Sequence, residues 1–282
     1  MLFDAHNHIH LGHHISPTLF NTKNLAGLSI MSTHPRDFPV VETTCKAFAQ
    51  RGLLAVPNYG AHPWFLHEIT EDDDDDTNSD YKASWINELK ERLENDPKAC
   101  VGEIGLDGLR WHVKPGNLAT PISKQQRIFE CQLKIASEYN RPVSIHVVQA
   151  WGPLFQSLKR VKQSNVGLPK DMYFHAFSGK SQMTYQQLVK ACACACADNT
   201  DPILYFGFAP IINFRSPKTK TVMECIGLNK LVLETDLENS DDVVEDLGKC
   251  ANFIANVFNT DVDHVMNQTY DNSKSLYRIH DA

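Results

Sequence analysis

Histidines and carboxylates recur along the chain at spacings that suit metal coordination. The first residues read FDAHNHIHLGHH, where Asp4 is followed by five histidines (His6, His8, His10, His13 and His14). His6 and His8 are two residues apart, so on an extended strand both side chains point to one face and can offer two nitrogens to one metal ion. Imidazole with carboxylate suits Zn, Mn, Fe or Co, and Mg where carboxylates and water dominate. The stretch alone leaves open which of the five bind a metal.

Residues of the same chemical type follow or end other short apolar runs: His62, Glu103, Asp107, His146, His175 and Asp236. A carboxylate such as Glu103 inside VGEIGLD, or Asp236 at the end of LVLETD, is costly to bury without a cation or another partner. Taken singly, His146 or His175 is more often an ordinary polar residue than a ligand. Taken together, these residues favour a binuclear metal site, in which two ions would activate water and neutralise charge at a phosphorus or carbonyl centre.

The elements that must position these residues are short apolar runs that alternate with helical patterns. The runs predict eight strands, at 2–6, 28–32, 53–59, 99–105, 142–148, 172–177, 203–208 and 230–235. The clearest predicted helices are 80–95, 123–139, 181–191 and 241–258. Eight such units in 282 residues favour a closed (β/α)8 TIM barrel, whose strand ends converge on one mouth.

An open doubly wound sheet is the competing architecture. It would normally place a glycine-rich phosphate turn after the first strand, where this chain has FDAHNH. Since the chain shows no internal repeat and no linker, we expect one domain over residues 1–282.

Composition limits the partners and the compartment. With a net charge of −7, the chain as a whole does not resemble a nucleic-acid binder, so a polyanion would need a local basic patch or bound cations. We expect no signal peptide and no membrane span, because no apolar run approaches ~20 residues. The eight cysteines include no CxxC pair and are expected to be reduced, with ACACACA (191–197) as small buried residues where a helix ends. The predicted location is therefore cytoplasmic, nuclear or both, and EDDDDDT (71–77) is expected to be a solvated loop.

Several ordered motifs together resemble one known family. They are D-x-H-x-H (residues 4–8), G-x-H-P (60–63), G-E-I-G-L-D-x-x-R (102–110), Q-x-x-x-F (125–129), P-V-x-I-H (142–146), H-x-F-S-G (175–179), L-E-T-D (233–236) and N-x-x-x-L (272–276). H-x-H alone is weak evidence, but the ordered set resembles the TatD family of metal-dependent deoxyribonucleases from residue 3 to about residue 277. The chain looks like a divergent member, similar in kind to fungal proteins of this type.

The resemblance implies roles for the motif residues. His6 and His8 would bind one divalent ion and His146 and His175 a second, the ions being Mg, Mn or Zn. Glu103 would bridge the two ions. Asp236 would bind the first ion and orient the nucleophilic water, and His62 would handle a proton beside the scissile phosphate. Asp4 is expected to steer the imidazoles rather than to bind a metal.

The resemblance also implies a function, and departures from the family pattern leave alternatives open. The implied activity is hydrolysis of DNA phosphodiesters by an exo- or endonuclease, with DNA or a nucleotide phosphodiester as substrate and a monomeric enzyme. However, Val148 stands where the family commonly has an arginine that would grip a phosphate, and acidic ENSDD (238–242) replaces a proline- and arginine-rich loop. The alternatives are a protein-interaction partner on a metal-bound scaffold, and a hydrolase of a small non-nucleic ester.

Overall fold

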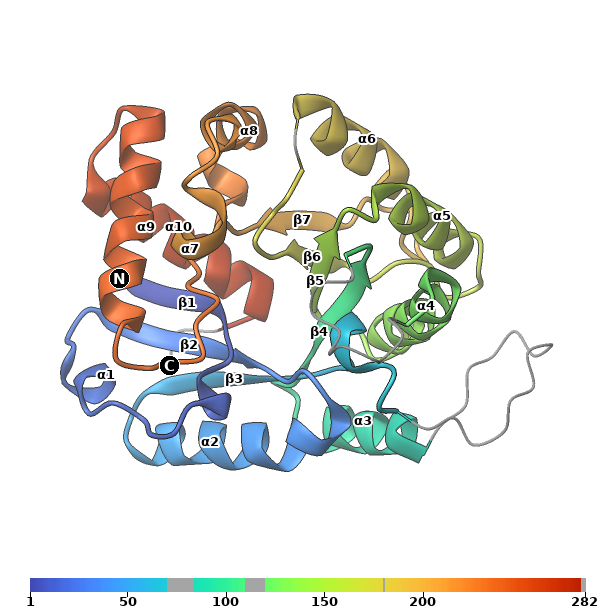
Figure 1. Ribbon diagram of the computed structural model, residues 1–282, viewed down its shortest axis with the longest axis horizontal. Coiled ribbons are helices and arrows are strands. Elements are labelled where there is room, and N and C mark those ends of the chain that lie inside the picture. The colour runs from blue at the N-terminus through green and yellow to red at the C-terminus, as the bar shows by residue number, and fades with distance from the viewer. Residues whose placement is uncertain (70–83, 110–119, 180, 280–282) are drawn as a thin grey trace.

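Strands and helices alternate along the chain in the computed structural model, which describes residues 1–69, 84–109, 120–179 and 181–279 (Figure 1). The strands are β1 (Leu2–Asn7), β2 (Leu25–Met31), β3 (Leu54–Tyr59), β4 (Cys100–Asp107), β5 (Val143–Val148), β6 (Asp171–Phe174) and β7 (Ile203–Phe206). The helices are α1 (Thr18–Asn21), α2 (Phe38–Gln50), α3 (Ser84–Asn95), α4 (Ile122–Glu138), α5 (Trp151–Lys162), α6 (Gln182–Cys192), α7 (Pro210–Asn213), α8 (Lys218–Ile226), α9 (Val243–Phe258) and α10 (Val262–Tyr277). Short 3₁₀ helices are η1 (Ile9–Leu11), η2 (Pro35–Asp37), η3 (Pro63–Phe65) and η4 (Leu228–Lys230).

The strands form one parallel sheet in chain order, from β1 to β7. Each strand is connected to its neighbour through helical segments that lie on the outside of the curved sheet, as Figure 1 shows for α2 to α6. Parallel neighbours in chain order are the arrangement of a (β/α)8 barrel rather than of a doubly wound sheet. The predicted barrel class is therefore confirmed. The acidic run 71–77 lies outside the described residues.

The predicted eighth strand, 230–235, does not form a regular strand. Lys230 ends η4, and the residues that follow it form an extended segment with a single parallel bridge, Phe206 to Leu231. The segment still connects both edges of the sheet, because Val232 N donates to Phe206 O at 3.0 Å and Ala5 N donates to Leu233 O at 2.8 Å. The ladder is interrupted at Thr235, whose backbone N–H donates to the Asp4 carboxylate at 3.0 Å instead of to a neighbouring strand.

A small inner core lies beneath the barrel mouth. It joins Phe3, Tyr173 and Tyr205, which come from three strands, to Leu276 and Tyr277 at the end of α10. The Tyr277 hydroxyl donates to Ala5 O at 2.6 Å, so the end of α10 packs against the floor of the barrel. A larger apolar cluster lies between the sheet and the helices. Because side chains fill the floor of the barrel, a functional site is expected at the mouth, where the strands end.

Two further predictions concern cysteines and membranes. Helix α6 ends at Cys192, with Cys192 and Cys196 buried and Cys194 exposed, and the cysteines of the described chain are free thiols. Among the described residues, no helix is both long enough and apolar enough to cross a bilayer.

Candidate metal centre

The predicted ligands come together at the C-terminal ends of the strands. Three lie within strands: His6 (β1), Glu103 (β4) and His146 (β5). His8 and His175 directly follow β1 and β6, His62 lies three residues after β3, and Asp236 lies in the extended segment 231–237. All are buried except Asp236, which keeps a small exposed fraction. The structure thus places in one mouth side chains that are up to 230 residues apart in the sequence. Their individual roles remain predictions.

Glu103 lies at the centre of the cluster. Its Oε2 is 3.1 Å from His8 Nε2 and 3.5 Å from His6 Nε2. Its Oε1 is 3.1 Å from His146 Nδ1 and 2.5 Å from His175 Nε2. One carboxylate therefore faces imidazoles on both sides, as a bridging ligand must.

Asp236 completes the side of the cluster next to β1. Its Oδ1 is 3.5 Å from His6 Nε2 and 3.6 Å from His8 Nε2. The His6 ring stacks on the His175 ring with centroids 3.8 Å apart. Ligand atoms of His6, His175 and Asp236 all lie within 4.8 Å of one another. His175, predicted to bind the same ion as His146, thus lies between the two sides.

Hydrogen bonds select the nitrogen that two of the histidines turn toward Glu103. His8 Nδ1 is 3.0 Å from Met31 O, and His146 Nε2 is 3.0 Å from Asp107 Oδ2. Both partners are acceptors, so these nitrogens carry protons and the opposite nitrogens point into the cluster. Burial lowers the pKa of both histidines, but hydrogen bonds to Glu103 and, for His146, to Asp107 outweigh it and raise each pKa to about 9. A cation at either site would therefore displace a proton.

His62 has the opposite arrangement. Its Nε2 is 3.2 Å from Glu103 Oε1, and His62 forms a compact group with Glu103 and His146. However, its Nδ1 accepts a hydrogen bond from Trp64 N at 3.2 Å. A neutral imidazole whose Nδ1 accepts a hydrogen bond carries its proton on Nε2, which then has no lone pair for a metal. Burial lowers the pKa of His62 to about 4, so the ring is neutral near pH 7. This geometry suits a hydrogen-bond donor better than a ligand.

The remaining charges agree with a cation site. Burial raises the pKa of Glu103, but the neighbouring His175 and the hydrogen bond from His146 help to outweigh it, and that pKa lies well below its usual range. Burial and His175 hold the pKa of His6 well below its usual value, which keeps this imidazole neutral. Glu103 Oε1 is buried, and its neighbours in the described part of the chain are imidazole nitrogens of His62, His146 and His175. Imidazoles packed around a buried, ionised carboxylate fit divalent cations, which would take the place of the protons on His8 and His146.

Asp4 acts on the backbone around the cluster and not on the imidazole rings. Its Oδ1 accepts from His6 N at 3.3 Å and Thr235 N at 3.0 Å, and its Oδ2 accepts from Asn7 Nδ2 and Thr235 Oγ1. Burial raises the pKa of Asp4 to about 7. Asp4 thus connects β1 to the segment just before Asp236, and in this way it could position the cluster as predicted.

The other histidines of the opening stretch lie outside the cluster. His10 is buried in η1 with its Nε2 3.8 Å from Asp37 Oδ2. His13 and His14 are exposed, and His14 Nε2 is 3.1 Å from Asp241 Oδ2. Of the five histidines, only His6 and His8 face Glu103.

The sequence did not reveal several residues that hold the ligands. Ser144 Oγ is 3.0 Å from His6 Nδ1, and Trp64 Nε1 donates to Asp107 Oδ2 at 2.7 Å. Gln125 holds the backbone of Asp107 by accepting from its N–H at 2.8 Å and donating to its C=O at 3.1 Å. Gln125 and Asp107 do occur in the quoted motifs, but only the fold shows what they contact.

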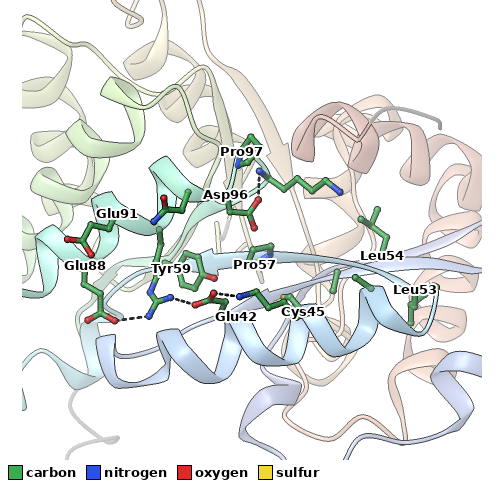
Figure 2. A pocket seen from close by; sticks show the side chains of 17 residues that line it. Glu42, Cys45, Leu53, Leu54, Pro57, Tyr59, Glu88, Glu91, Asp96 and Pro97 are labelled. Atoms are coloured by element: carbon green, nitrogen blue, oxygen red, sulfur yellow. Dashed lines mark hydrogen bonds and ion pairs between the residues drawn. The ribbon is translucent and has the colours of Figure 1, made fainter.

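Two cavities among the described residues differ in their relation to the cluster. The larger, about 920 Å³, lies between α2 and α3 near the start of β3, at the opposite end of the barrel (Figure 2). Its wall holds Arg92, which pairs with Glu42 and Glu88. The smaller, about 560 Å³, is lined by Asp107, the residue bonded to His146, and by Gln149. Of these two cavities, the smaller is connected to the cluster, through the contact of Asp107 with His146.

A parallel barrel with histidines and carboxylates at its mouth defines the class of metal-dependent hydrolases. Within that class the chain belongs to the TatD related DNase family, whose model matches residues 3–278. The barrel also superimposes on the crystal structure of YjjV, a TatD homologue from Escherichia coli, with a TM-score of 0.73 and 21% identity over 99% of this chain and 98% of that chain.

Three curated relatives are similar over different shares of the chain. The Cut9-interacting protein scn1 of Schizosaccharomyces pombe is 22% identical over 89% of this chain and 91% of its own length. An uncharacterized metal-dependent hydrolase of Haemophilus influenzae is 26% identical over 83% of this chain and 80% of its length. The human 3'-5' RNA nuclease TATDN2 is 25% identical over 63% of this chain and 19% of its length. Together with the family match, they identify a metal-dependent hydrolase.

Proposed function

We propose that this protein is a two-metal phosphodiesterase that cleaves DNA. The observation that carries the proposal is Glu103, a buried carboxylate with imidazole nitrogens facing both of its oxygens. The family model is that of DNases, and one relative is named as a nuclease of RNA, which supports phosphodiester chemistry more strongly than the choice of DNA.

We assign the ligands as follows. His6, His8 and Asp236 would hold one divalent ion, His146 and His175 the other, and Glu103 would contact both. Mg, Mn or Zn would suit this mixture of imidazole and carboxylate. Divalent ions bound there would lower the pKa of a bound water molecule and neutralise charge on the phosphate.

The chain's own groups would act on the attacking water and on the leaving oxygen. Asp236 keeps an exposed fraction of 16%, so its carboxylate can accept a hydrogen bond from the attacking water at the open side of the cluster. His62 keeps a proton on Nε2, so the neutral ring can donate a hydrogen bond that stabilises charge developing on the leaving oxygen, which then takes its proton from water. Water activation and leaving-group stabilisation would thus fall to Asp236 and His62 respectively.

Substrate contact near β5 would differ from the usual family pattern. Val148 ends β5 half-buried, beside the exposed Gln149 that lines the 560 Å³ cavity. Without an arginine at Val148 and with a net charge of −7, phosphate binding would depend largely on the cations. We therefore expect weak affinity for long polyanions and turnover that relies on the metal centre.

The decisive experiment is an activity screen of the metal-loaded protein with single-stranded DNA, RNA, an aryl phosphodiester and a carboxyl ester. Cleavage of DNA by the wild type and not by Glu103→Gln would support the proposal. Cleavage of the carboxyl ester alone would replace it with hydrolysis of a small non-nucleic substrate. A metal-loaded protein that cleaves none of the phosphodiesters would refute it.

A role in protein interaction is the second candidate, and one observation favours it. The relative from S. pombe that aligns with 89% of this chain is named for its interaction with Cut9. Under this function, partner capture would be unaffected by Glu103→Gln or Asp236→Asn. Loss of capture in those variants would connect binding to the metal centre instead.

A further inference from the structure

Glu234 is a fully buried carboxylate beneath the cluster and is not one of the candidate ligands. It lies within the extended segment 231–237, two residues before Asp236. Neither of its oxygens faces the cluster. Its Oε1 accepts from Ala176 N at 2.7 Å, and its Oε2 accepts from the Tyr173 hydroxyl. Both partners belong to the segment that carries His175.

The backbone turns sharply at both ends of this connection. Ala176, directly after His175, has a φ of 38°, and Asp236 has a φ of 59°. Non-glycine residues rarely adopt these left-handed conformations unless surrounding contacts hold them. The Ala176 N–H is held by Glu234, and Asp236 N donates to His6 O at 2.9 Å. Each candidate ligand is thus fixed through its backbone.

The fold leaves space for this carboxylate. A Cβ added at Gly207 would overlap Glu234 Oε2 and the Tyr173 hydroxyl. Gly207 also exchanges backbone hydrogen bonds with the same loop, donating to Phe174 O at 3.1 Å and accepting from Phe177 N at 2.9 Å. The glycine at the end of β7 therefore permits the contact between Glu234 and the His175 loop.

We infer that Glu234 is a positioning residue that sets the geometry of His175 and Asp236 through the Ala176 N–H. The inference rests on the proposed metal-binding function. Side chains that orient ligands commonly change metal affinity by about 10–100-fold when they are removed. We expect an effect of this size although Glu234 touches no ligand ring.

The test compares Glu234→Leu with Glu234→Gln. Leucine has a similar size but cannot accept a hydrogen bond, whereas glutamine can accept from Ala176 N–H and donate to the Tyr173 oxygen. Co²⁺ is titrated into metal-free protein by calorimetry, and the visible absorption of bound Co²⁺ reports ligand geometry. We expect Glu234→Leu to lower Co²⁺ affinity by about 10–100-fold and to change the absorption band. Glu234→Gln should remain close to the wild type in both.

Asp171→Leu is the matched control. Asp171 is a buried carboxylate at the opposite end of β6, where it accepts from Arg278 Nη2 at 2.7 Å. Its loss should lower the melting temperature and leave Co²⁺ affinity and absorption unchanged. If Glu234→Leu behaves like Asp171→Leu, Glu234 has only a structural role and the inference is wrong.

A second variant keeps the test decisive if Glu234→Leu does not fold. Gly207→Ala displaces the Glu234 carboxylate without altering it, and should weaken Co²⁺ binding in the same direction. Unchanged binding in Gly207→Ala would overturn the inference. Phosphodiester cleavage is scored separately in the wild type. Its absence would refute the proposed function, while the Co²⁺ comparison would still decide the role of Glu234.

Discussion

The two sides of the metal centre are held in place by different means. On the side next to β1, Asp4 holds the backbone that carries His6 and Asp236, and Glu234 connects this segment to the backbone next to His175. On the side next to β4 and β5, Asp107 and Trp64 contact the rings of His146 and His62 directly. Ring contacts occur on both sides, since His8 Nδ1 lies 3.0 Å from Met31 O, but the first side adds buried carboxylates that hold the backbone beneath the cluster.

This difference predicts that substitutions on the two sides have different effects. The β1 side is enclosed by fully buried carboxylates, so a change there alters the backbone beneath the ligands. The β4–β5 side adjoins the cavity lined by Asp107 and Gln149, and Val148 ends the neighbouring strand. Substitutions on that side can therefore alter leaving-group stabilisation or substrate affinity while the barrel stays intact.

Glu103→Gln should have the largest effect, because Glu103 belongs to both sides. An amide would leave the surrounding cations without their shared negative ligand, so we expect turnover to fall at least about 1,000-fold. The measurement is kcat with metal content determined by elemental analysis. Glu42→Gln, in the cavity at the other end of the barrel, should keep wild-type activity (Figure 2). Substantial turnover by Glu103→Gln would show that the two sides do not depend on a common ligand.

Asp236→Asn tests the β1 side alone. Asparagine tolerates the left-handed backbone found at Asp236, where φ is 59°, so the fold should be retained. We expect turnover to fall at least about 100-fold, because the amide cannot orient and deprotonate water as a carboxylate does. Circular dichroism checks the fold and steady-state kinetics the activity. A variant close to wild-type turnover would remove Asp236 from the mechanism.

His62→Gln and His146→Gln compare leaving-group stabilisation with metal binding on the β4–β5 side. Since the His62 Nε2 carries a proton, His62→Gln should lower kcat about 100-fold while Co²⁺ affinity is retained. His146→Gln should instead lose Co²⁺ affinity. If the two variants lose equal amounts of bound metal, His62 is a ligand and the assignment from the Trp64 hydrogen bond is wrong.

The sequence predicted well which residues gather in one cluster, because their signal is local. Alternation along an extended strand places His6 and His8 on one face, and the predicted strand ends bring Glu103, His146 and Asp236 to one mouth. The roles of neighbouring groups depend on distant contacts. The proton on His62 follows from Trp64, and the nitrogen that His146 turns inward follows from Asp107. Neither contact can be read from spacing alone.

The same distinction explains the error at residues 230–235. The apolar pattern of KLVLET correctly predicts an extended, buried segment for residues 231–235, while Lys230 belongs to η4. It does not show that Asp4, 231 residues away, accepts the Thr235 N–H and interrupts the ladder. Likewise Glu234 appears in a motif with no visible role until the fold brings it to Ala176. Tertiary hydrogen bonds to side chains thus set the limits of prediction in this barrel.

Asp107→Asn should have a smaller effect than loss of a ligand. Asparagine keeps an oxygen for the Trp64 and His146 N–H groups but removes the negative charge, and Gln125 continues to hold the backbone. We expect Co²⁺ affinity to fall about tenfold with little change in melting temperature. Calorimetry beside a thermal melt measures both. An unchanged affinity would mean that the orientation of His146 does not depend on Asp107.

Val148→Arg should have the smallest effect and the opposite sign. An arginine at the end of β5 would place a bidentate phosphate donor beside the cavity, while the metal ligands on the β1 side are untouched. We expect KM for single-stranded DNA to fall about threefold and the logarithmic salt dependence to steepen by roughly 0.7, with kcat unchanged. Val148→Met supplies the added length without charge and should match the wild type. If Val148→Arg leaves both KM and its salt dependence unchanged, the DNA substrate does not contact the end of β5. Val148 would then not be a cause of weak phosphate binding. A gain confined to Val148→Arg would instead show that this side governs substrate affinity independently of the metal centre.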